Sequence, residues 1–393
     1  AFLKDKTGTE NYSHELIKTI LDLPEAKKHE FRLYVRGSHE GYEPSCRNVE
    51  VVEIGWKRLW TQGGLALEGL MRPVDVLWIP AHTLPIVRWP KLKTVVTIHG
   101  LEYEYLPEYY DWRKKWYLNK STEYAVRRAD KIIAVSKWTK SQLVDRLGAD
   151  EKKIKVIYEG VGERFMKEGL TNLKHKRQVR YKYGLPENYI LFVGTIQPRK
   201  NLVRLIKAFS LLFSGLSTNS SPQRSGLKGV PSRTDLNHRT DPTQKTVMNL
   251  IIAGKEGWMT DEIYEAPKKY GVEDRVKFIG RVADEDLAMV YKEATLFVWP
   301  SLMEGFGLPV LEAMQMGVPV ITSDRGALPE VVGKAGLLID PENVNELSKA
   351  IELGLKSREL RQGLREKGYK QVKKFSWEKA AKQTLSVLLK TNG

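Results

Sequence analysis

Two glutamates frame a short glycine-containing loop near residue 305. Glu304 opens the run EGFG, and Glu312 follows eight residues later. The run comes after an apolar strand candidate at residues 296–299 and before a helical pattern, which brings backbone N–H groups and a positive helix end to the carboxyl edge of a parallel sheet. This arrangement suits a diphosphate, and the two carboxylates suit sugar and ribose hydroxyls. Two simpler interpretations stay open: the glycines form only a tight turn, and Glu312 only favours the helix dipole.

A second cluster of polar residues follows another strand candidate, residues 189–194. The segment from Thr195 to Asn201 enters a helical pattern and carries Arg199 and Lys200. Two unit charges about 4 Å apart interact by roughly 4 kcal/mol at an effective dielectric constant of 20, enough to matter for a leaving diphosphate. The alternative is a solvated basic turn, with Asn201 serving as a helix N-cap.

Two series of apolar strands, many of them followed by helical patterns, must position these residues. The strand candidates are residues 31–35, 49–54, 74–79, 94–98, 131–135 and 155–157, then 189–194, 247–253, 276–279, 296–299, 318–322 and 336–339. The helical patterns are residues 10–22, 114–128 and 137–147, then 202–213, 261–270, 285–292, 309–316, 328–332 and 344–355. Such alternation predicts parallel sheets covered on both faces. We therefore expect two doubly wound α/β domains, joined near residues 165–176.

The remaining sequence features bound the class of protein. A chain of 393 residues suits two domains, and no apolar run reaches the roughly 18 residues of a membrane-spanning helix. Residues 214–245 are rich in Ser, Thr, Pro, Gly and Arg without a period, so we expect a mobile surface insertion. The single cysteine, Cys46, cannot form an intramolecular disulfide, which fits a reducing compartment.

The net charge of +16 is the one unusual bulk property. Lys and Arg are spread along the chain rather than gathered in one arm, so a solvated basic surface is the simplest interpretation, a membrane-surface role comes next, and nucleic acid is disfavoured. Residues 103–128 interleave aromatic and basic side chains, as at a membrane interface. An ordinary helix whose aromatic rings pack on the sheet is the competing interpretation.

Four segments in order carry a family resemblance: RADKIIAVSKWTK, VGTIQPRKN, EGFGLPVLEAMQMGVPVI and FSWEKAA. Together they resemble glycosyltransferase family 4, the retaining "glycosyl transferases group 1" with the GT-B fold, over nearly the whole chain outside the insertion. The resemblance implies two Rossmann-like domains facing a central cleft, residues 1–170 and 171–375. It also implies a terminal helix, residues 376–393, that crosses back to the first domain. The family's first strand precedes Gly8 by more residues than this chain has, so we expect that strand to be truncated.

The resemblance also implies a role for each matching residue. Glu304 and His99 correspond to residues near the transferred sugar, Glu312 to the ribose-binding glutamate, and Lys200 to the lysine that binds the diphosphate. Many members have an arginine where this chain has Thr195, and we expect Arg199 to supply that charge. The expected catalytic residues are thus Glu304, His99, Lys200 and Arg199. The expected donor-binding residues are Gly8, Thr9, Thr195, Arg281, Val282, Gly305, Phe306, Gly307, Leu308 and Glu312.

The implied activity is transfer of a sugar from a nucleotide-diphosphate sugar to a glycan or lipid-linked acceptor, with retention and with neither cofactor nor essential metal. The PRKN variant favours a mannosyltransferase of surface-polysaccharide biosynthesis that uses GDP-mannose. We expect a cytoplasmic protein, peripheral at the inner face of the membrane. Three alternatives stay open: a nucleotide-sugar epimerase of the same fold, a glycoside hydrolase with paired carboxylates, and a non-catalytic basic binding protein.

Overall fold

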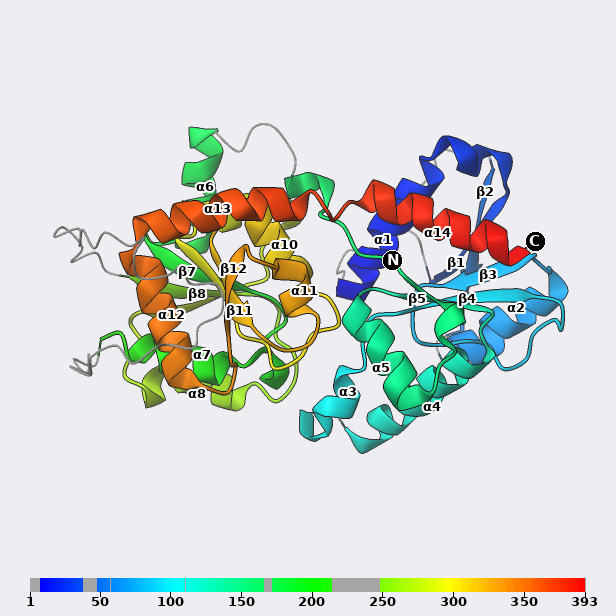
Figure 1. Cartoon of the computed structure of the whole chain (residues 1–393), viewed down its shortest axis with the longest axis horizontal. Coiled ribbons are helices and arrows are strands. Elements are labelled where there is room, and N and C mark those ends of the chain that lie inside the picture. Colours follow the sequence, from blue (N-terminus) through cyan, green and yellow to red (C-terminus); the bar gives the residue numbers. More distant parts are fainter. Residues whose placement is uncertain are drawn as a thin grey trace. The chain divides into compact units, whose positions relative to one another are not determined.

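A computed structural model describes residues 8–37, 48–56, 58–109, 111–165, 172–213 and 248–392. The chain divides into two compact units (Figure 1). Unit 1 consists of residues 1–160 and 375–393, and unit 2 consists of residues 161–374. The predicted insertion at residues 214–245 lies outside the described residues.

Unit 1 contains two parallel sheets rather than one continuous sheet. Strands β1 (Phe31–Arg36) and β2 (Val49–Ile54) pair with each other. The larger sheet has the order β3-β4-β5-β6, built from Val76–Ile79, Lys93–Ile98, Lys131–Ala134 and Ile154–Val156. No described strand joins β1 or β2 to β3, so a single doubly wound sheet is not formed in the described part of this unit.

Helices cover the larger sheet of unit 1. They are α1 (Gly8–Leu21), α2 (Ala66–Met71), α3 (Glu102–Tyr105), α4 (Trp112–Arg128), α5 (Lys137–Leu147) and α14 (Trp377–Asn392). The terminal helix α14 lies beside α1 and packs on β4 (Figure 1). The Ser376 side chain accepts a hydrogen bond from the backbone N–H of Lys379 at 3.4 Å, as expected of an N-cap.

Unit 2 is a six-stranded, all-parallel sheet with the order β12-β11-β10-β7-β8-β9. In chain order, β7 to β12 are Tyr189–Val193, Asn249–Ala253, Val276–Gly280, Leu296–Trp299, Val320–Ser323 and Gly336–Ile339. All four residues of β10 are buried, as expected for a central strand covered on both faces. The order reverses between β7 and β10, so the topological switch point of the sheet lies there.

Two groups of helices enclose this sheet (Figure 1). Helices α7 (Leu202–Ser210), α8 (Asp261–Lys269) and α12 (Val344–Lys356) pack together. Helices α6 (Leu173–Tyr183), α9 (Asp284–Lys292), α10 (Leu308–Gln315) and α13 (Arg358–Val372) form the second group, with α11 (Leu328–Val332) against α10. The α/β class predicted from the sequence is therefore confirmed.

Candidate active site

The switch point of unit 2 carries both polar segments singled out in the sequence. The loop after β7 contains Arg199 and Lys200, and the loop after β10 contains Glu304. Because β7 and β10 are parallel neighbours, both loops leave the same carboxyl edge of the sheet. In open α/β sheets, ligands bind at this position, outside the carboxyl ends of the strands at the switch point.

The loop after β10 is shaped to start a helix. Gly307 has φ +130° and is the N-cap of α10. This φ angle favours glycine, and a Cβ atom there would lie 2.8 Å from Cδ2 of Leu328, so the Leu328 side chain would also have to shift. Pro309 is the second residue of α10, not the first as expected, and Gly317 lies just past the helix end with φ +70°.

Three charged side chains meet in this loop region. Lys200 Nζ lies 2.5 Å from Glu304 Oε1, and Arg199 Nη1 lies 2.9 Å from the same oxygen. Arg199 also donates to the Met303 carbonyl at 3.2 Å, while Lys200 Nζ lies 4.3 Å from the centre of the Trp299 ring. Lys200 and Glu304 are both buried. The predicted cations are thus held by the predicted glutamate rather than solvated.

Burial and charge act in opposite directions on Glu304. Burial alone raises the pKa of its carboxyl group, but the positive charges of Arg199 and Lys200 outweigh burial and lower that pKa to about 2. Glu304 is therefore ionised at every physiological pH, and the three side chains together carry a charge of +1.

Glu312 occupies a separate polar cluster on α10. Its Oε2 accepts a hydrogen bond from the Tyr291 hydroxyl at 2.8 Å, and its Oε1 lies 3.4 Å from Arg164 Nη2. Arg164 also pairs with Asp284 at 2.9 Å. Burial raises the pKa of Glu312, and the charge of Arg164 only partly offsets this effect. The two glutamates of the EGFG region thus have opposite pKa shifts.

The remaining predicted residues of unit 2 lie on neighbouring loops of the same sheet edge. Thr195 is partly buried, directly after β7 and Gly194. After β9, Val282 is buried and Arg281 is exposed. Gly305 and Phe306 are buried beside Glu304, and Leu308 opens α10.

The predicted histidine lies at the carboxyl end of β4 in unit 1. Both ring nitrogens of His99 are engaged: Nε2 lies 3.1 Å from the Pro80 carbonyl and Nδ1 lies 3.5 Å from Glu159 Oε1. Because a carbonyl only accepts hydrogen bonds, Nε2 carries a proton. Burial raises the pKa of Glu159, and the contact with His99 only partly offsets this effect.

Two aromatic neighbours fix the ring plane of His99. The Tyr12 ring packs edge-on at 4.6 Å, and the His82 ring stacks at 6.0 Å with an interplanar angle of 8°. Burial lowers the pKa of His82 to about 3, so His82 stays neutral. The other predicted residues of unit 1, Gly8 and Thr9, are exposed in the first turn of α1.

Several residues that the sequence did not predict contact the predicted residues and hold their side chains in place. Tyr291, Arg164 and Glu159 each contact a predicted side chain directly. None of them stands in a recognisable motif or at an informative spacing, so only the folded chain identifies them.

Among the described residues, no three His, Cys, Asp or Glu side chains gather as metal ligands. No helix in the described part is long and apolar enough to cross a bilayer.

Comparisons with known proteins agree with this geometry. Residues 7–164 match the family model "Glycosyltransferase Family 4", and residues 228–371 match "Glycosyl transferases group 1". The O-antigen chain mannosyltransferase B of Escherichia coli is 31% identical over 295 residues, which cover 75% of this chain and 69% of that protein. The serotype-specific mannosyltransferase WbdA of Escherichia coli is 30% identical over 77% of this chain, but over only 33% of its own length.

The solved structures show the same fold. HepE from Anabaena, solved in complex with UDP and glucose, superposes with a TM-score of 0.70 over 98% of both chains at 18% identity. One family assignment agrees with the switch-point loops, the two family models and the 31% identical relative. The chain belongs to glycosyltransferase family 4, has the GT-B fold and is a glycosyltransferase.

Proposed function

We propose that this enzyme transfers mannose from GDP-mannose to a glycan or lipid-linked acceptor with retention of the anomeric configuration. The observation that carries the proposal is the cluster of Lys200, Arg199 and Glu304 at the switch point of unit 2. Two cations at the carboxyl edge of a parallel sheet suit a nucleoside diphosphate, which is the leaving group of such a donor.

In this proposal Lys200 and Arg199 stabilise the negative charge that develops on the departing diphosphate. The bond between the anomeric carbon and the phosphate oxygen breaks, and the acceptor hydroxyl forms the new bond on the same face. The departing phosphate oxygen takes the proton of that hydroxyl. The N-terminus of α10 adds a positive helix end.

The two glutamates have different roles in the proposal. Glu304 is ionised and lies at the start of the loop, where it contacts the sugar and holds the two cations. Glu312 accepts from Tyr291 and pairs with Arg164, which leaves it oriented to bind ribose hydroxyls. His99 and Gly8 serve the same reaction from unit 1, as the family resemblance implies.

Two donors compete as candidates. GDP-mannose is favoured by the mannosyltransferase relatives of 30–31% identity and by the PRKN segment. UDP-glucose is the second candidate, because HepE was solved with UDP and with glucose. Cytoplasmic location and peripheral contact with the inner membrane face belong to the same proposal.

A donor panel tests the proposal. The protein is incubated with UDP-, GDP- and ADP-sugars, with and without a mannan-type acceptor, and release of nucleoside diphosphate is measured. We expect release from GDP-mannose that depends on the acceptor, and an axial anomeric linkage by NMR. Turnover of the donor without acceptor would indicate an epimerase or hydrolase instead, and preference for UDP-glucose would overturn the mannose assignment.

A further inference from the structure

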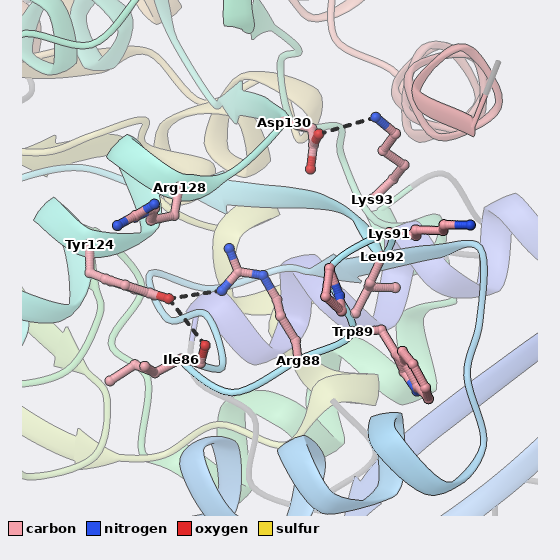
Figure 2. Close-up of a pocket in the computed structure, with 10 residues that line it drawn as sticks. Ile86, Arg88, Trp89, Lys91, Leu92, Lys93, Tyr124, Arg128 and Asp130 are labelled. Atoms are coloured by element: carbon pink, nitrogen blue, oxygen red, sulfur yellow. Dashed lines mark hydrogen bonds and ion pairs between the residues drawn. The ribbon is translucent and has the colours of Figure 1, made fainter.

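An open cavity of about 780 Å³ lies in unit 1, and none of the predicted catalytic or donor-binding residues lines it (Figure 2). Lys93, which lines it, opens β4, and Asp130 immediately precedes β5. Arg128 is the last residue of α4. The cavity therefore lies at the amino edge of the sheet, whereas His99 follows the carboxyl end of β4.

The cavity has a strong positive charge. Its lining contains four cations, Arg88, Lys91, Lys93 and Arg128, and one carboxylate, Asp130. Asp130 Oδ2 already accepts hydrogen bonds from the backbone N–H and the hydroxyl of Thr94, both at 2.9 Å, and Oδ1 lies 3.6 Å from Lys93 Nζ. The single carboxylate is therefore satisfied by its own neighbours, and a net charge of +3 remains.

One of these cations is held in place by hydrogen bonds, and two others are available to bind a ligand. Arg88 Nη1 donates to the Tyr124 hydroxyl at 2.8 Å (Figure 2) and also to the Pro85 carbonyl at 2.7 Å. Across the residues that the structure describes, the side chains of Lys91 and Arg128 make no hydrogen bond or ion pair. An oriented guanidinium beside two available cations is the arrangement expected of a phosphate site.

Apolar side chains stand exposed beside this charge. Ile86 and Val87 have 62% and 58% of their surface exposed, and the Trp89 ring is nearly half exposed. Trp89 Nε1 donates to the Leu70 carbonyl at 2.9 Å, which holds the indole beside α2, where Met71 is also exposed. A small soluble anion needs only the charges, whereas an anionic lipid surface uses both the charges and the apolar side chains.

We propose that this cavity binds the phosphate headgroup of an anionic lipid and that unit 1 contacts the membrane with the amino edge of its sheet. Ile86, Val87 and Trp89 enter the headgroup region, where aromatic and aliphatic side chains are favoured. Lys91 and Arg128 contact lipid phosphates. The inference rests on the peripheral membrane contact of the proposed function, but it does not depend on the identity of the donor, because none of these residues belongs to the switch-point cluster.

Flotation with lipid vesicles tests the proposal. The full chain is mixed with vesicles of phosphatidylcholine alone or with added phosphatidylglycerol. We expect binding only to the anionic vesicles. The double variant Lys91→Glu/Arg128→Glu should weaken that binding by at least roughly 25-fold, since each basic residue near the surface contributes about fivefold.

A matched control separates this site from the overall charge. Lys349→Glu/Lys367→Glu makes the same change in net charge at exposed residues of α12 and α13. This control variant should bind anionic vesicles with an affinity within about twofold of that of the original protein. A second variant, Ile86→Ser/Val87→Ser, should lose the fraction of binding that survives high salt, which the charges alone do not explain.

Three results would overturn the proposal. The first is equal vesicle binding by the cavity variant and the control variant. The second is displacement of the protein from vesicles by millimolar glycerol phosphate, which would identify a soluble phosphate ligand. The third is loss of DNA binding rather than vesicle binding in the cavity variant.

Release of nucleoside diphosphate with a soluble acceptor should be unchanged in Lys91→Glu/Arg128→Glu, so failure of this proposal and failure of the donor assignment are distinguishable.

Discussion

At the scale of single residues, the central feature is one carboxylate oxygen that holds two cations. Glu304 Oε1 contacts both Lys200 and Arg199, so both cations are already in place for the proposed diphosphate. Such preorganised charge is the largest single contribution to catalysis in many enzymes. The buried position of the group strengthens these interactions relative to water.

Removing one of the cations should affect turnover more than folding. We predict that Lys200→Ala lowers kcat by roughly 10²–10³-fold, the effect of losing one charge-stabilising donor. Lys207→Ala, an exposed lysine on α7, is the matched control and should keep normal kcat. Steady-state kinetics with circular-dichroism melting checks both variants, and near-normal turnover in Lys200→Ala would remove this lysine from the site.

The two glutamates should separate in their kinetics. Glu304→Gln should mainly reduce kcat, because in the proposed mechanism Glu304 contacts the sugar, on which charge develops in the transition state. Glu312→Gln keeps the size of the side chain and should mainly raise the KM for the donor. Interchangeable kinetics of the two variants, measured over a range of donor concentrations, would contradict this division of roles.

The depressed pKa of Glu304 has a consequence for stability in acid. Its folded-state pKa of about 2 lies below the ordinary value of 4.5, so its stabilising contribution is present above pH 4.5 and is lost as the pH falls towards 2. The difference corresponds to on the order of 3 kcal/mol. Urea unfolding between pH 5 and pH 2 should therefore show a steeper loss of stability in the original protein than in Glu304→Gln, and parallel curves would refute the shift.

At the scale of elements, the loops after β7 and β8 pack closely behind the site. A Cβ atom on Gly254 would lie 1.8 Å from the carbonyl oxygen of Gly194, and Gly254 has φ +155°. The backbone of Gly254 also donates to the Gly280 carbonyl at 2.8 Å, which ties the β8 loop to the end of β9. Three neighbouring loops of the sheet edge therefore support one another.

Substitution at this contact should be costly. We predict that Gly254→Ala destabilises unit 2 by more than about 3 kcal/mol, since both the clash and the dihedral angle oppose it. Gly363→Ala is the control, because that glycine lies within α13 with no atom within 4 Å of the added Cβ. The control should gain about 0.4–1 kcal/mol. Chemical denaturation measures both, and similar stability of the two variants would contradict the close approach.

The strands could be predicted from the sequence more completely than the helices and the side-chain contacts. All twelve strand candidates appear within two residues of their predicted ends, because buried parallel strands are short apolar runs that are easily recognised. Helices α6 and α13 were not predicted, since both are rich in Lys and Arg and bury only a narrow stripe. The grouping of Lys200, Arg199 and Glu304 followed from the carboxyl-edge rule, whereas the partners of Glu312 depend on packing that no pattern reveals.

At the scale of the whole molecule, the chain leaves unit 1 after Gly160 and returns to it at Phe375. The two points are close together, because a Cβ atom on Gly160 would lie 2.2 Å from the backbone nitrogen of Trp377. The helix that follows, α14, packs on α1 and β4. The core of unit 1 is therefore complete only when α14 is in place.

This dependence can be tested on one helix. Leu385 of α14 is 4% exposed and Leu389 is 39% exposed. We predict that Leu385→Ala destabilises unit 1 by about 2–5 kcal/mol, while Leu389→Ala changes its stability by less than about 1 kcal/mol. Hydrogen exchange should show lost protection in β4 and α1 of Leu385→Ala but normal protection in β7 and β10. Uniform loss across both units would mean that the units do not fold independently.

Taken together, the two proposals make the ends of β4 set a minimum reach for a membrane-anchored acceptor. Lys93 at the amino end lines the cavity proposed to bind lipid, and His99 follows the carboxyl end. Six residues of extended strand separate them, a distance of about 20 Å. If the amino edge rests on the bilayer, a tethered acceptor must span at least the height of the sheet before its terminal hydroxyl meets the donor. Under this proposal the enzyme extends long chains, and other enzymes add the sugars nearest the membrane.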